Sequence, residues 1–185
     1  MNIYFGRIKY EEGKRKSFGA YVIVPSPFSF KGVFLLWNRH WRAYNLLAGH
    51  WEEEKDGRDE NGEPNFFKTA VREIQEEFGE LGIKIEETFY SLHKIGGKIE
   101  FIAYSQRAKE WTFYSHRLFL LEWKKNPDAL FSKLTSPHAF FLPPYYLLNP
   151  DESPVPLADA IYILNNESKE FRDVLLKMER GSKRY

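Results

Sequence analysis

The stretch NFFKTAVREIQEEFG, residues 65–79, says more about the fold than any other part of this sequence. Its apolar residues recur at intervals of three and four, the period of a helix that buries one face, at Phe67, Ala70, Val71, Ile74 and Phe78. Asn65 is suited to cap the start of such a helix, and the glycines at positions 79 and 82 are suited to end it. We therefore predict an amphipathic helix over residues 66–78.

Three carboxylates crowd one turn of this helix. Glu73, Glu76 and Glu77 stand at i, i+3 and i+4, which places them on one side of it. Like charges at these spacings destabilise a helix by about 0.2–0.5 kcal/mol per pair, and a bound divalent cation such as Mg²⁺ or Mn²⁺ offsets that cost. A solvated acidic face, partly neutralised by Lys68 and Arg72, explains the same residues without a metal.

The residues around these glutamates favour metal binding. Residues 72–79, REIQEEFG, match the core of the Nudix box, Arg-Glu-aliphatic-x-Glu-Glu-x-Gly, so the segment resembles the Nudix hydrolase family. The resemblance implies that Glu73, Glu76 and Glu77 are catalytic residues that bind Mg²⁺ or Mn²⁺. It also implies that Arg72 orients Glu73 by ion pairing and that the backbone carbonyl of Gly49 is a further metal ligand.

The upstream half of the box departs from the family pattern of a Gly, five residues, a Glu and seven residues before the Arg. We align Gly49 with that Gly because an apolar strand precedes it, which leaves an insertion over residues 53–61. Residues 53–63 are almost wholly charged or turn-forming, and we expect an exposed loop there. Four carboxylates outside the helix are candidates for an extra ligand or the general base: Glu52, Glu63, Glu110 and Glu122. Glu100 is a further candidate, and outward-facing positions on half-buried strands explain Glu100 and Glu122 more readily than such a role.

The chemistry of phosphoanhydride hydrolysis suits this donor set, because the diphosphate must be neutralised and a water brought in line. We predict a metal-dependent hydrolase that cleaves a phosphoanhydride bond in a nucleoside diphosphate linked to another moiety. The alternative is a Nudix-like domain that binds a nucleotide or a protein without cleaving it. The insertion favours this alternative, and so does Glu80, which stands where the family has an aliphatic residue.

A second group of residues combines aromatic rings with cations just before the box. Such a combination suits stacking on a base and pairing with phosphate, and we predict substrate binding by Trp37, Arg39, Trp41 and Arg42. A hairpin connection with exposed indole edges explains them nearly as well. The same residues would suit a nucleic-acid-binding module, but a net charge of +1 argues against nucleic acid as a partner.

Length and composition restrict the number of domains and the classes of protein to which this chain can belong. A length of 185 residues favours one domain, residues 1–185, and 43% hydrophobic residues are enough to build a core. The lack of cysteine excludes disulfide frameworks and thiolate metal sites. No apolar run approaches the length of a membrane span, so we expect a cytoplasmic protein with no membrane partner. The family resemblance implies a small-molecule nucleotide substrate. A homodimer is compatible with the sequence.

The resemblance implies an α/β fold, a Nudix-like α/β/α sandwich with a mixed β-sheet. Apolar runs and alternation predict strands at residues 18–25, 33–37, 43–48, 87–94, 98–105 and 111–123. We expect Gly96 and Gly97 to form a hairpin turn between the fourth and fifth of these strands. The proline-rich segment 136–156 is predicted to be an ordered surface loop, and residues 168–179 a last amphipathic helix.

Overall fold

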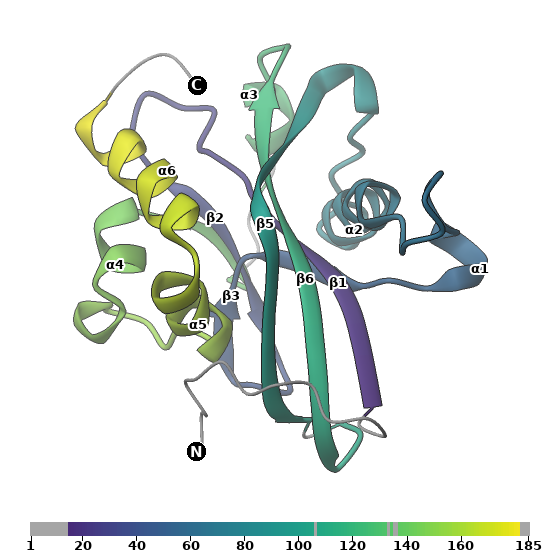
Figure 1. The fold of residues 1–185 in the computed structure, drawn as a ribbon. Helices are drawn as coiled ribbons and strands as arrows, with labels where there is room; N and C mark the ends of the chain where they lie inside the picture. Colours follow the sequence, from purple (N-terminus) through teal and green to yellow (C-terminus); the bar gives the residue numbers. More distant parts are fainter. Residues whose placement is uncertain (1–14, 106, 133, 135–136, 182–185) are drawn as a thin grey trace.

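The computed structural model describes residues 15–181, apart from positions 106, 133, 135 and 136 (Figure 1). The strands are β1 (Arg15–Ile23), β2 (Val33–Asn38), β3 (Ala43–Asn45), β4 (Leu47–His50), β5 (Tyr90–Ser105), β6 (Glu110–Trp123) and β7 (Ala139–Leu142). The α-helices are α1 (Glu53–Asp56), α2 (Phe66–Glu80), α3 (Asp128–Phe131), α4 (Pro144–Leu148), α5 (Asp159–Glu167) and α6 (Lys169–Arg180). Single turns of 3₁₀-helix occur at Glu87–Phe89 and Pro150–Glu152.

The strands form two sheets. The first has the order β4-β1-β6-β5, in which β1 and β6 run parallel while the outer pairs, β1 with β4 and β5 with β6, are antiparallel. The second sheet, β3-β2-β7, is antiparallel. The prediction of an α/β fold with a mixed sheet is confirmed.

Both faces of the first sheet are covered, as the apolar residues on both sides of β1 require. Ala20 and Val22 point to the face on which α2 packs, together with Ala70 and Ile74 of that helix. The opposite face carries a second cluster to which α5 and α6 contribute Ile161, Leu164, Phe171 and Leu175. In Figure 1, α2 lies on the right of the first sheet and α4, α5 and α6 lie on the left, so the expected α/β/α layering is confirmed. No helix within the described residues is both long and apolar enough to cross a membrane.

Two predictions about strands are wrong. Gly96 and Gly97 do not turn the chain: β5 continues through them as one strand, with a register shift between Ile95 and Lys98 where two residues bulge out of the pairing with β6. The run 43–48 is two strands, because β3 pairs with β2 in one sheet and β4 pairs with β1 in the other. The buried Leu46 lies between them, where the chain passes from one sheet to the other.

Two predicted loops also contain regular structure. Segment 53–63 begins with the short helix α1, whose Asp56 is only 1% exposed, so it is not wholly an exposed loop. Within segment 136–156, of which residue 136 lies outside the described part, the chain adds β7 to the second sheet and then forms α4. Sequence reasoning also missed α5, which precedes the predicted last helix.

Candidate active site

Helix α2 is fixed at both its start and its inner face. The Asn65 side chain accepts a hydrogen bond from the backbone N–H of Lys68 at 3.1 Å, which caps the first turn as predicted. Ile74 and Phe78 are fully buried, and Phe78 packs on Phe34 of β2 with ring centroids 5.1 Å apart. This packing sets the rotation of the helix. It places Glu73 on the buried side, where it is 9% exposed.

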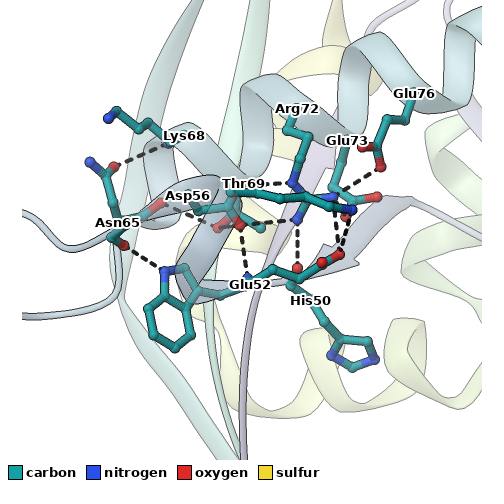
Figure 2. Close-up of polar contacts among 12 residues, drawn as sticks. His50, Glu52, Asp56, Asn65, Lys68, Thr69, Arg72, Glu73 and Glu76 are labelled. Carbon is teal, nitrogen blue, oxygen red and sulfur yellow. Dashed lines mark hydrogen bonds and ion pairs between the residues drawn. The ribbon is translucent and has the colours of Figure 1, made fainter.

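The guanidinium of Arg72 connects α2 to the segment that precedes it (Figure 2). Arg72 Nη1 donates to Glu73 Oε1 at 2.7 Å and to Glu76 Oε2 at 3.0 Å. Arg72 Nη2 donates to the backbone carbonyl of His50 at 2.7 Å. The prediction implied by the family, that Arg72 pairs with Glu73, agrees with this geometry. The same cation also restrains Glu76.

Asp56 is the strongest partner of Arg72, and sequence reasoning missed it. Its two carboxylate oxygens accept from Arg72 Nε at 2.8 Å and from Nη2 at 3.0 Å, a bidentate pair. Asp56 also accepts from Thr69 Oγ1 at 2.9 Å and from the backbone N–H of Glu52 at 3.0 Å. Burial alone would raise the pKa of Asp56, but these hydrogen bonds outweigh it and lower the pKa below its ordinary value. Asp56 is therefore a buried carboxylate that stays ionised and fixes Arg72.

One signal in the sequence pointed to Asp56. The family pattern has a Glu six positions after its Gly, and Asp56 lies seven positions after Gly49. With Asp56 in that role, the residues between it and α2 are the extra ones. They form a compact turn in which Arg58 pairs with Pro64 in an isolated β-bridge, and the Arg58 guanidinium lies 5.2 Å from the centre of the Trp51 ring.

Gly49 lies directly beneath the Glu73 carboxylate. A side chain at Gly49 would collide with it, because an added Cβ would lie 1.7 Å from Glu73 Cδ and 1.8 Å from Oε1. Only glycine lets the carboxylate approach the backbone of β4 this closely. The two residues that the family resemblance assigns to one metal site are therefore in contact.

The carboxylates of α2 differ in their surroundings. Burial raises the pKa of Glu73 to about 7, against the opposing pull of Arg72. Burial also raises the pKa of Glu77 to about 7, with help from the negative charges of Glu80 and Glu76. Within the described part of the chain, no hydrogen-bond donor or cation pairs with Glu77. Burial disfavours the ionised form of both carboxylates, and a divalent cation bound between them would stabilise that ionised form.

The donor set fits a hard divalent cation in type and number, with carboxylates from Glu73, Glu76 and Glu77 and a backbone oxygen from Gly49. The close approach of Gly49 and Glu73 supports this fit. The ligands are not gathered in advance: among the described residues, no three Asp, Glu or His side chains converge in a metal-binding arrangement. Arg72 instead holds Glu73 and Glu76.

The four additional carboxylates lie in different places. Two lie beside the insertion: Glu52 is near Arg72 at 3.8 Å and Lys55 at 3.1 Å, and Glu63 pairs with Lys98 of β5 at 2.6 Å.

The other two lie on β6. Glu110 lies near Arg15 at 3.8 Å, at the start of the strand. Glu122 bonds to His93 at 2.8 Å, and alternation along β6 directs it to the sheet face opposite α2. Their roles as ligand or base stay predictions.

The predicted substrate-binding residues lie on the second sheet and its β2–β3 turn. Trp37 packs on Tyr44 with ring centroids 5.0 Å apart, and Trp41 is 50% exposed. Arg42 has a positive φ of 50°, in a turn whose backbone is held by Asn38. Substrate contact by these residues stays a prediction.

Solved structures show the same arrangement of elements. NrtR of Shewanella oneidensis, solved in complex with a 27mer DNA, matches with a TM-score of 0.50 and 14% identity over 86% of this chain. A structure of the NUDIX domain of NrtR, complexed with ADP ribose, matches over 88% of this chain and 93% of its own, with 12% identity and a TM-score of 0.47. This chain has a Nudix fold. The recognition based on residues 72–79 is confirmed at the level of fold by the NrtR structure with a TM-score of 0.50.

A further solved structure also matches with low sequence identity. Ap4A hydrolase of C. elegans matches over 90% of this chain and 97% of its own, with 17% identity and a TM-score of 0.45. The chain spans 63% of the length of the NrtR chain solved with DNA. No family model and no curated protein matches the sequence.

Proposed function

We propose that this chain is a Nudix-type pyrophosphohydrolase that uses Mg²⁺ or Mn²⁺ to cleave a phosphoanhydride bond in a nucleoside diphosphate linked to another moiety. The observation that carries the proposal is the Glu73 carboxylate, held by Arg72 against the backbone of Gly49 on the box helix. The Nudix fold supports it, because the motif occurs on the helix that the fold requires. We propose further that residues 1–185 act as one domain.

The residues that would hold the cation are Glu73, Glu76, Glu77 and the carbonyl of Gly49. When bound, the cation supplies charge neutralisation for the diphosphate and lowers the pKa of water. Arg72 orients Glu73, and it stays charged because the hydrogen bonds that it donates to Asp56 raise its pKa further above the ordinary value.

Asp56 in turn prevents Arg72 from swinging into solvent. In this proposal the carboxylates of α2 bind the cation, whereas Arg72 and Asp56 hold those carboxylates in position.

The test is phosphate release, through a coupled phosphatase, from nucleotide sugars, dinucleoside polyphosphates, ADP-ribose, NADH and nucleoside triphosphates in Mg²⁺ or Mn²⁺. Wild type should turn over at least one class, and Glu77→Gln should lose that activity by two orders of magnitude or more. Glu60→Gln, a change of the same kind in the exposed turn before α2, is the matched control and should keep it. Full turnover by Glu77→Gln would overturn the assignment of the metal ligands.

A second candidate function is nucleotide binding without cleavage. It is favoured by the ion pairs from Arg72 to Glu73 and Glu76, which engage two of the three carboxylates. If this candidate holds, wild type binds a nucleotide equally well in chelator and in Mg²⁺ and releases no phosphate. Metal-dependent turnover excludes it.

A further inference from the structure

His116 of β6 is a buried imidazole without hydrogen bonds. The residue is 6% exposed, and neither Nδ1 nor Nε2 has a hydrogen-bond partner among the residues that the structure describes. Buried polar atoms are nearly always paired, because each one left unpaired destabilises the folded state. His116 therefore calls for an explanation outside packing.

The imidazole lies near the predicted metal ligand Gly49. Gly19 of β1 lies between His50 of β4 on one side and His116 of β6 on the other, in one row across the sheet. A Cβ at Gly19 would lie 3.1 Å from His116 Nε2 and 2.5 Å from the carbonyl oxygen of Gly49. The absence of a side chain at Gly19 thus lets the Gly49 carbonyl oxygen and His116 Nε2 lie close to the same point of the sheet.

The other neighbours of His116 are aromatic. Its ring centroid lies 4.9 Å from that of Tyr21, 5.6 Å from Tyr114 and 5.9 Å from Phe101. Phe101 and Tyr114 are only partly buried and stack on each other at 5.1 Å. Burial, with a smaller contribution from His50, lowers the pKa of His116 to about 3, so the ring is neutral. A neutral imidazole offers one donor and one acceptor.

These features favour a neutral polar ligand over a phosphate. A phosphate buried against an uncharged ring would lose its hydration without gaining an opposite charge. A sugar hydroxyl or the edge of a base both donates and accepts, as this imidazole does, and aromatic rings stack on bases.

We propose that His116 contacts the nucleoside part of the substrate, on the sheet face opposite α2, and hydrogen-bonds a sugar hydroxyl or base edge. The ligand reaches the imidazole once the partly exposed rings beside it move aside. The inference rests on the proposed function only in placing the diphosphate at Gly49 and the α2 carboxylates. It adds a specificity-determining residue that the box motif does not contain.

The test uses nucleotides that cannot be cleaved. Wild-type protein with ¹⁵N-labelled histidine is titrated, in Mg²⁺, with the α,β-methylene diphosphates of adenosine, guanosine, cytidine and uridine, and separately with methylenediphosphonate. At least one nucleoside analogue should shift the His116 ring nitrogens, whereas methylenediphosphonate, which lacks a nucleoside, should not. No shift with any of the four analogues overturns the proposal, as does an equal shift with methylenediphosphonate.

Substitution separates binding from packing. His116→Phe should bind the active analogue at least tenfold more weakly and methylenediphosphonate as well as wild type does. Its Tm should not fall, because the change removes two unpaired polar atoms from the interior. His93→Phe, the same change at a half-exposed histidine of the neighbouring strand, is the control and should bind normally. His116→Gln, which keeps hydrogen-bonding groups, is the second variant and should lose less affinity than His116→Phe.

These outcomes distinguish the two proposals. Unchanged binding by His116→Phe refutes the role of His116, even if wild type hydrolyses a nucleotide. Nucleoside-dependent binding without hydrolysis of any nucleotide refutes the proposed activity and leaves the role of His116 in place.

Discussion

The sharpest prediction concerns the stability of a variant that removes one charge, Glu77→Gln. Glu77 is partly buried and pairs with no cation among the described residues, so the folded protein resists its ionisation in the absence of metal. Gln has nearly the same shape and no charge. We expect the variant to be more stable than wild type without metal near pH 8, although it lacks a proposed catalytic residue.

The magnitude follows from the pKa, which burial raises from 4.5 to about 7. Each pKa unit corresponds to about 1.4 kcal/mol, so full ionisation of Glu77 costs the folded state at most about 3 kcal/mol. Because the side chain keeps some contact with water, we expect about 1–3 kcal/mol. The folded state holds the proton more tightly than the unfolded chain. This contribution to wild-type stability therefore falls as the pH rises from about 4.5 to about 7 and is constant above that. The stability of Glu77→Gln relative to wild type rises over the same pH range.

Urea unfolding in chelator, at about pH 4.5 and about pH 8, measures the difference, with Glu60→Gln as the control that should match wild type. Adding Mg²⁺ or Mn²⁺ at the higher pH should stabilise wild type and the control more than Glu77→Gln, because the cation binds the folded state through this carboxylate. Two results would refute the reasoning. One is a variant less stable than wild type near pH 8 without metal, and the other is an equal response of both proteins to the cation.

Three further predictions test how the site is held. Asp56→Asn should lower the free energy of unfolding by about 2–4 kcal/mol at neutral pH, because Arg72 loses its bidentate partner; a loss below about 1 kcal/mol in urea unfolding contradicts this. Since the pKa of Asp56 lies below its ordinary 3.8, the pair contributes fully above that pH and is lost as the pH falls further. Gly49→Ala should fold but lose its thermal shift with Mg²⁺, because its Cβ would force the Glu73 carboxylate, the far end of a side chain that can rotate, out of its position against Gly49. Gly19→Ala should be destabilised more than Gly49→Ala, since its Cβ would lie 2.5 Å from a backbone oxygen, and an equal Tm for the two variants would show otherwise.

Local pattern was enough to predict α2 and the carboxylates on it. Period, N-cap and packing all act within the helix, so residues 66–78 were predicted within two positions of the observed end at Glu80. The central strands β1 and β6 of the first sheet were predicted for the same reason, because their apolar residues report burial on two faces.

Features that depend on distant partners could not be predicted in this way. Gly96 and Gly97 have the composition of a turn, but the unbroken strand β6 pairs with the chain on both sides of them and turns the pair into a bulge. Asp56 belongs to a run of charged residues in the sequence. Its burial depends on Arg72 and Thr69, which approach it only when α2 packs on the sheet.

The lack of hydrogen-bond partners at His116 within the described residues could not be predicted from the sequence either. A histidine in a strand is usually paired, and only the assembled sheet reveals that both nitrogens lack a partner among the described residues.

Two glycines in adjacent strands link the halves of the proposed site. The position of a Cβ at Gly49 is filled by the Glu73 carboxylate, from the side of α2. The position of a Cβ at Gly19 lies between the Gly49 carbonyl and His116, on the other face of the sheet. Gly49 therefore presents its backbone to both faces at the sheet edge formed by β4. A side chain at Gly49 would displace the Glu73 carboxylate, and one at Gly19 would collide with the Gly49 carbonyl oxygen, which is a physical reason for glycine at each.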